Sequence, residues 1–270
     1  MRPVYGGRLW RILVSVLRLI TIPISHFCEK ARWALDRAGI AYREERHVQG
    51  IHQIVARRAG GRLTVPVLVT PGGVLTESEQ IVGWADDRTP AEHQLYPGDA
   101  GERAEVERLN RRFDSVLGPR ARRLMYVHML PERELMLRFN NTGVPRWEDR
   151  ALRLGWPLLG HLAKSHFGIR PGIEVEDEAV VWQELDFVAG LLADGRPYLC
   201  GERFGAADLT FAALAAAAIV PPIYGTPLPQ PADMDPEMAE AVLRWRSHPA
   251  GEFALRLFSE ERPTPRVTAT

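Results

Sequence analysis

The amino-acid sequence changes character at residues 88–99, and this change constrains the fold more than any other feature. Before this segment, short apolar runs alternate with stretches of helical spacing; after it, apolar residues recur mainly at three- and four-residue steps. The segment itself, RTPAEHQLYPGD, contains two prolines and a glycine, which favours a linker. A chain of 270 residues has room for two domains. We therefore expect a mixed α and β domain followed by an all-helical one.

The residues before the linker predict strands and helices in alternation. VLRLITIPI (16–24) is rich in branched apolar residues and predicts a strand that ends at Pro23. Two apolar runs around Pro71-Gly72-Gly73 predict a β-hairpin. The expected order is strand 16–24, helix 26–39, strand 42–48, helix 51–59, strands 65–70 and 74–76, and helix 77–86.

The residues after the linker predict a helical bundle. AADLTFAALAAAAIV (206–220) is almost wholly apolar, but it is too short to span a membrane, so we expect it to be the buried central helix. Pro221 and Pro222 end it, and a proline-rich loop runs to Pro236. The other expected helices are 101–130, 148–168, 176–193 and 237–258.

Charge and cysteine content limit the possible partners and location. The chain carries 34 Lys and Arg against 34 Asp and Glu, which argues against a general nucleic-acid binder. The apolar stretch 9–24 is interrupted by Arg11 and Arg18, so we expect neither a signal peptide nor a membrane anchor. Two cysteines, Cys28 and Cys200, are too few for a disulfide framework. A reducing, cytoplasmic location is expected.

Ser25 and Cys28 lie where the first strand gives way to the first helix. Backbone N–H groups and the helix dipole favour an anion such as a thiolate at this point. The Ser25 hydroxyl can donate a hydrogen bond to a thiolate, or it can simply cap the helix. Cys28, one turn later, is either a reactive thiol or a small buried apolar residue.

Two further places combine unusual backbone with polar groups. A proline that opens an internal strand makes sense if the Val65–Pro66 bond is cis, because the Val65 backbone groups then turn toward a ligand; the alternative is an edge strand with a trans proline. Glu77 and Ser78 precede a helix, where they can bind a ligand or cap the helix.

The order of these motifs resembles the glutathione S-transferase family. SHFCEKARWAL is similar to the family's strand-to-helix motif, TVPVLV to its cis-proline strand, LTESEQIVGWAD to its Glu-Ser motif and PYLCGERFGAADLTFAAL to its second-domain signature. The resemblance covers residues 16–258. It implies a thioredoxin-like N-terminal domain, an all-α helical-bundle C-terminal domain and a homodimer. The implied parts are an extension 1–15, the glutathione-binding domain 16–88, the linker 89–99, the helical domain 100–260 and a flexible tail 261–270.

The resemblance also assigns roles to individual residues. Ser25 corresponds to the catalytic residue that activates the glutathione thiol in serine-type members, and Asp208 to a buried acid that organises the second-domain helix. Glutathione is the implied co-substrate, and no metal is expected. The implied glutathione-binding residues are Val65, whose backbone pairs with the cysteinyl part, the cis-proline Pro66, Glu77 and Ser78 at the γ-glutamyl end, and His52 at the glycyl carboxylate.

The sequence departs from the family pattern at three places. His26 stands where proline is usual, and Gly205 stands where Ser or Thr commonly caps the buried helix. Residues 119–175 are longer than usual, and we expect them either to reshape the electrophile pocket or to form a surface or dimer contact. Five arginines are expected to form a solvated helix face, with a basic face near the cleft as the alternative: 111, 112, 120, 122 and 123.

The leading hypothesis is a detoxifying glutathione transferase that joins the glutathione thiolate to a small hydrophobic electrophile. The first alternative is a thiol–disulfide oxidoreductase that depends on Cys28, because Ser25-x-x-Cys28 has the spacing of a redox Cys-x-x-Cys motif with its first cysteine replaced. The second alternative is a non-catalytic scaffold that binds glutathione or another ligand, since fold does not determine function.

Overall fold

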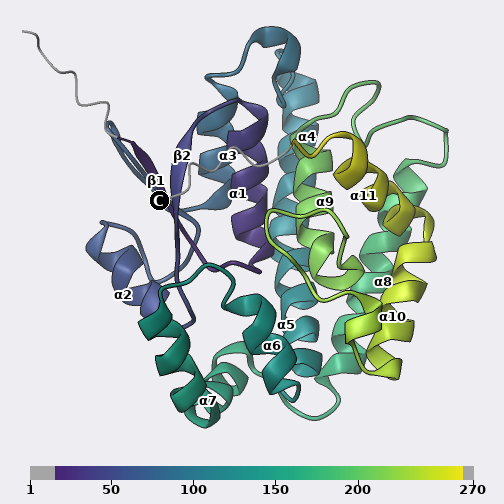
Figure 1. The fold of residues 1–270 in the computed structure, drawn as a ribbon. Coiled ribbons are helices and arrows are strands. Elements are labelled where there is room, and N and C mark those ends of the chain that lie inside the picture. Colours follow the sequence, from purple (N-terminus) through teal and green to yellow (C-terminus); the bar gives the residue numbers. More distant parts are fainter. Residues whose placement is uncertain (1–15, 264–270) are drawn as a thin grey trace, which may run out of the picture.

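The computed structural model describes residues 16–263. Its N-terminal part contains a four-stranded sheet and three helices (Figure 1). The elements follow the predicted order, with slightly shorter strands. They are β1 (Leu17–Thr21), α1 (His26–Arg37), β2 (Tyr42–Arg46), α2 (Ile51–Arg58), β3 (Val67–Thr70), β4 (Gly73–Leu75) and α3 (Ser78–Asp86).

The sheet has the strand order β2-β1-β3-β4. β1 pairs in parallel with β2 and antiparallel with β3, and β3 and β4 form the predicted hairpin. Because side chains alternate along a strand, Leu19 and Leu68 belong to the main core with α1 and α3, whereas Ile20 and Val67 pack with Ala56 of α2. This arrangement is the thioredoxin-like domain that the resemblance implied.

The C-terminal part is mostly helical, as predicted. α9 is buried along almost its whole length and packs against α4, α5, α10, α11 and also α1 of the first part. Figure 1 shows α9 at the centre of the bundle. The helices are α4 (Ala100–Arg112), α5 (Gly118–Met129), α6 (Arg133–Asn140), α7 (Arg146–Phe167), α8 (Ile173–Leu191), α9 (Ala206–Ile219), α10 (Pro236–Ser247) and α11 (Pro249–Glu260).

Two long helices of the prediction are each divided in the structure. The expected helix 101–130 is split into α4 and α5 by a π-helical turn, Phe113–Leu117. Pro119 follows this turn and lacks the N–H that would continue regular helix bonding. The expected helix 237–258 is split at Pro249, because the preceding His248 adopts extended backbone. The short helix α6 was not predicted.

The two ends of the chain were expected to be an extension and a tail. The extension 1–15 and residues 264–270 lie outside the described residues. Arg262, which was assigned to the flexible tail, is instead buried against α1, where its side chain donates to Glu29 and Asp36. No helix within residues 16–263 combines the length and the apolar content needed to cross a membrane.

Candidate functional site

Ser25 is the N-cap of α1. Its backbone N–H donates to the carbonyl of Ile22 at 3.2 Å, and its Oγ accepts from the Cys28 N–H at 3.4 Å. The residue is half-buried, in contrast to its neighbours Ile24 and His26, which are buried. A serine hydroxyl of a half-buried residue therefore lies at the positive end of a helix dipole.

A buried arginine holds the turn before Ser25. Arg32 donates from Nη2 to the carbonyls of Ile22 (3.3 Å) and Pro23 (2.9 Å). Two buried carboxylates bind the same guanidinium: Glu29 at 3.1 Å from Nη1 and Glu44 at 2.7 Å from Nε. Charge-assisted hydrogen bonds are shorter and stronger than neutral ones. The turn that presents Ser25 is therefore held from inside the domain.

Cys28 is fully buried, and burial raises the pKa of its thiol to about 11. A thiol in this state is protonated at neutral pH and inaccessible to a disulfide substrate. Both Cys28 and Cys200 are unpaired. The environment of Cys28 therefore weighs against the oxidoreductase hypothesis and matches the small buried apolar residue that was its alternative.

His26, the residue that replaces the usual proline, is almost wholly buried. Burial first, and the charge of Arg122 second, lower the pKa of its imidazole to about 3, so the ring is neutral. The ring lies against Phe27, with the ring centroids 4.6 Å apart. Its Nε2 has no hydrogen-bond partner within residues 16–263.

The Val65–Pro66 peptide bond is cis, as the sequence predicted. It lies directly before β3, whose Val67 pairs with Ile20 near the end of β1. Because β3 runs antiparallel to β1, the start of β3 and the turn at Ser25 meet at the same edge of the sheet. The backbone of Val65 thus lies at the same end of the sheet as Ser25.

Glu77 and Ser78 lie at the start of α3, with Glu77 as N-cap and Ser78 as the first helical residue. β4 is antiparallel to β3 and so runs in the direction of β1, which brings the start of α3 to the same sheet edge as Ser25. Ser78 is buried, and Glu77 makes an exposed ion pair with Arg62 at 3.4 Å. An exposed pair of this kind adds little stability, so a ligand ammonium can replace Arg62 at low cost.

His52 lies in the first turn of α2, which follows β2. β2 is parallel to β1, so this turn also lies at the Ser25 edge. Burial lowers the pKa of His52 to about 4, and its buried Nδ1 has no hydrogen-bond partner in the described part of the chain. The fold thus brings all the predicted residues to one edge; their contacts with glutathione stay a prediction.

The comparisons with known proteins agree with this geometry. Residues 19–93 match the family model described as glutathione S-transferase, N-terminal domain. A glutathione S-transferase from Pseudomonas fluorescens has a similar structure, with 17% identity and a TM-score of 0.58 over 94% of this chain and 100% of its own. Residues 19–93 thus match the N-terminal domain of the glutathione S-transferase family, and the chain as a whole has the fold of these solved structures.

Two other structures with this fold contain glutathione. A glutathione S-transferase from Methylobacillus flagellatus with GSH bound is 18% identical, with a TM-score of 0.53 over 92% of this chain and 100% of its own. A glutathione transferase from Burkholderia graminis, with two glutathione molecules bound per subunit, is 17% identical, with a TM-score of 0.57 over 93% of this chain and 85% of its own. No curated protein matches the sequence.

The segment 119–175, which we interpreted from the sequence as an expansion, contacts the N-terminal domain. Glu148 of α7 pairs with His47 at 2.8 Å and accepts from the Val48 N–H at 3.1 Å. Gln49 donates to Asn140 of α6 at 2.7 Å. This segment therefore supports the loop that leads into α2 and His52. The sequence did not predict this contact.

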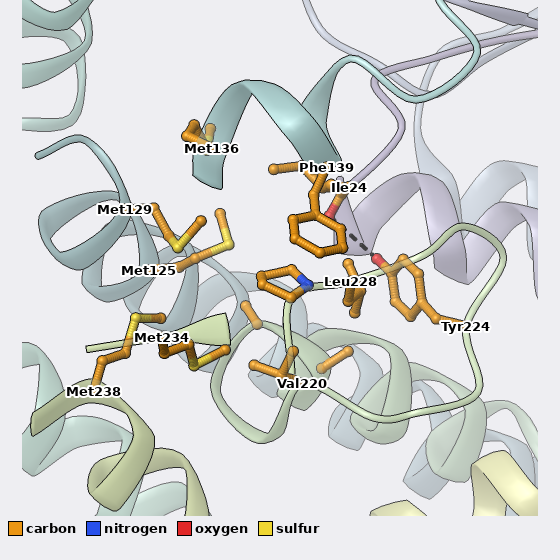
Figure 2. Close-up of a pocket in the computed structure, with 13 residues that line it drawn as sticks. Ile24, Met125, Met129, Met136, Phe139, Val220, Tyr224, Leu228, Met234 and Met238 are labelled. Carbon is orange, nitrogen blue, oxygen red and sulfur yellow. Dashed lines mark hydrogen bonds between the residues drawn. The ribbon is translucent and has the colours of Figure 1, made fainter. Parts of the chain in front are cut away.

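An apolar cavity of about 30 Å³ is lined in part by Ile24, the residue before Ser25 (Figure 2). The Tyr224 hydroxyl donates to the Ile24 carbonyl at 3.3 Å. Methionines from several helices fill much of the space: Met125 and Met129 of α5, Met136 of α6 and Met238 of α10, with Met234 from the preceding loop. Flexible thioether side chains can repack around an apolar guest.

The five arginines that were expected to form a solvated face have different surroundings. Arg112 pairs with Glu184 of α8 at 2.7 Å, while Arg120 and Arg123 pair with Asp177. Arg111 is exposed. Within residues 16–263 the structure has no group of three or more His, Cys, Asp or Glu side chains that could hold a metal ion.

Proposed function

We propose that the chain is a glutathione transferase in which Ser25 activates the thiol. The position of Ser25, a half-buried residue whose hydroxyl caps the start of α1, is the observation that carries this proposal. Its bond from the Cys28 N–H uses an acceptor lone pair of Oγ, which leaves the hydroxyl hydrogen available to a thiolate.

The reaction needs three things from the protein. Ser25 and the dipole of α1 stabilise the thiolate, and a hydrogen bond to a charged group is worth about 1.5 to 3 kcal/mol. The Val65 backbone and the start of α3 hold the tripeptide, so that the sulfur stays beside its target. The sulfur then forms a bond to an electrophilic carbon, the leaving group departs with its electron pair, and the thiol proton goes to solvent.

The test is Ser25→Ala with glutathione and chlorodinitrobenzene. We expect kcat/KM to fall about 10- to 100-fold, because one charge-assisted hydrogen bond to the thiolate is lost. Ultraviolet titration of the bound thiolate should give a higher thiol pKa, while KM for glutathione changes little. Ser259→Ala removes an exposed hydroxyl elsewhere and serves as control. A rate equal to that of the wild type would remove Ser25 from the mechanism.

A homodimer, a cytoplasmic location and a role in detoxification are further proposals that rest on the family resemblance.

The scaffold hypothesis is distinguished from catalysis by the same assay. Retention on glutathione resin without turnover of any electrophile would favour a binding protein.

A further inference from the structure

A polar hollow of about 320 Å³ lies between the first half of α5 and the end of α7. This volume lies in the range of small-molecule sites. Its walls include three arginines of α5, namely Arg120, Arg122 and Arg123, together with His166 and Phe167 of α7. The hollow is therefore strongly basic and has one aromatic wall.

The three arginines differ in their partners. Arg123 binds both oxygens of the buried Asp177, from Nε at 2.6 Å and from Nη2 at 2.7 Å, and Arg120 approaches the same carboxylate at 3.3 Å. Arg122 makes no ion pair within residues 16–263, and its buried Nε has no hydrogen-bond partner there. One guanidinium in the wall of the hollow thus lacks a counter-ion.

The Arg122 guanidinium is held in place by aromatic rings rather than by acids. Its central carbon lies 5.0 Å from the ring centroid of Phe167 and 5.7 Å from that of Phe27. Burial lowers the pKa of Arg122, because the charged form loses hydration without gaining an anion. An anionic ligand in the hollow would compensate for that loss and could bind the guanidinium in a planar, bidentate manner.

The hollow is linked through Phe27 to the first turn of α1, which follows the proposed catalytic residue. Phe27 belongs to the first turn of α1, two residues after Ser25. The start of α5 packs closely against the same ring, because a Cβ added to Gly118 would lie only 2.7 Å from Phe27 Cζ. Arg122 in the wall of the hollow and the start of α5 thus both lie against Phe27, on the side of the Ser25 turn where we expect an electrophile to approach the thiolate.

We propose that this hollow binds the carboxylate of the electrophilic co-substrate through Arg122, so that the transferase acts preferentially on small aromatic acids. The proposal rests on the function proposed above. For an aryl chloride acid, the glutathione sulfur forms a bond to the carbon that carries chlorine, and chloride leaves with the bonding electron pair. The thiol proton goes to solvent, and the carboxylate stays unchanged on Arg122.

A carboxylate near Arg122 could instead come from glutathione itself, which also carries carboxylates. The two sources are distinguished by steady-state kinetics. Loss of an electrophile contact raises KM for the electrophile, whereas loss of a glutathione contact raises KM for glutathione with every electrophile.

The experiment compares chlorodinitrobenzene, which is neutral, with chlorodinitrobenzoate, which carries a carboxylate. We expect Arg122→Gln to reduce kcat/KM for the benzoate by about tenfold or more and to change the value for the neutral compound less than about threefold. Arg122→Lys keeps the charge and should restore part of the loss. Arg111→Gln removes an exposed arginine that does not line the hollow, and it should affect neither compound.

Calorimetry with dinitrobenzoate, which has no leaving group, tests the hollow without turnover. Weaker binding by about tenfold in Arg122→Gln supports the proposal even if no conjugation is found, and in that case only the proposed function fails. Equal losses for the neutral and the acidic electrophile, a rise in KM for glutathione alone, or the same affinity for dinitrobenzoate in wild type and variant would overturn the proposal. Thermal unfolding of each variant identifies any loss that is due to misfolding.

Discussion

At the scale of single residues, the buried neutral His26 gives the clearest effect of pH. The unfolded chain binds a proton at this residue below about pH 6.5, whereas the folded protein does so only below a pKa of about 3. Protonation therefore favours the unfolded state between these values. The contribution of this neutral imidazole to the free energy of unfolding is present in full above about pH 6.5 and is lost as the pH falls toward 3.

We expect His26→Gln to flatten the acid side of the stability curve. A single such group gives a slope of up to about 1.4 kcal/mol per pH unit in the free energy of unfolding. Urea unfolding at several pH values between 6.5 and 4 measures this slope in the wild type, in His26→Gln and in the exposed control His93→Gln. If His26→Gln and the wild type have the same slope, the imidazole is not held neutral by burial.

The sequence predicted where most residues of the candidate site lie in the fold, but not which of its charged side chains form ion pairs. Ser25, the cis bond at Pro66 and the helix start at Ser78 follow from local patterns, because strand ends, prolines and caps leave signals within a few residues. The pairing of Arg123 depends on Asp177, 54 residues away. No local pattern separates Arg122, which lacks such a partner, from the other arginines.

At the scale of elements, α7 supports the domain that carries Ser25. Glu148 is buried, and its carboxylate forms hydrogen bonds with two groups of the loop before α2, the His47 ring and the Val48 N–H. A buried acceptor with two partners is costly to remove, because both donors lose their bond. α7 thus contributes to the position of α2 and His52.

We expect Glu148→Ala to loosen the start of α2. Removal of the carboxylate should cost about 1 to 3 kcal/mol and should speed hydrogen exchange in residues 47–58. Glu134→Ala, at an exposed position on α6, is the matched control. Unchanged exchange in this segment would mean that α7 packs beside the loop without holding it.

The helix boundaries show why elements were only partly predictable. Apolar spacing continues through residues 101–130, so it predicts one helix, whereas the Gly118-Pro119 pair interrupts the backbone bonding. The greater length of residues 119–175 stays a prediction. The contact of this segment with the first domain depends on Glu148 and Gln49, which are polar residues without a periodic signal.

At the scale of the whole molecule, the end of the described chain closes over α1. Arg262 donates to Glu29 at 2.7 Å and to Asp36 at 2.8 Å, and the Glu261 carbonyl accepts from the indole of Trp33 at 3.1 Å. All these partners belong to α1 and are buried. Buried ion pairs therefore connect the last described residues with α1 of the first domain.

We expect Arg262→Met to destabilise the protein by about 3 to 5 kcal/mol, because buried carboxylates lose a partner. Urea unfolding followed by tryptophan fluorescence should give a lower midpoint than that of the wild type. Arg244→Met replaces a half-exposed arginine and should change the midpoint little. An unshifted midpoint in Arg262→Met would show that the closure of the chain over α1 adds no stability.

The predicted two-part architecture is confirmed at this scale. It could be predicted because two separate sequence patterns indicate it: the alternation of strands and helices in the first part and the apolar segment 206–220 in the second. The position of Arg262 could not be predicted. Its surroundings, Arg-Pro-Thr-Pro, have the composition of a loose tail, and only the complete fold provides the acids that bury it.

The contacts of Arg262 have one consequence for the use of this protein. Arg262 binds Glu29, Glu29 binds Arg32, and Arg32 holds the carbonyl of Pro23, two residues before Ser25. Two side chains, those of Glu29 and Arg32, therefore connect Arg262, near the end of the described residues, with the turn that presents the hydroxyl. We expect a label or carrier protein joined at the C-terminal end to disturb the contacts of Arg262 before those of Ser25. Kinetic comparisons should therefore use proteins with the label at the same position.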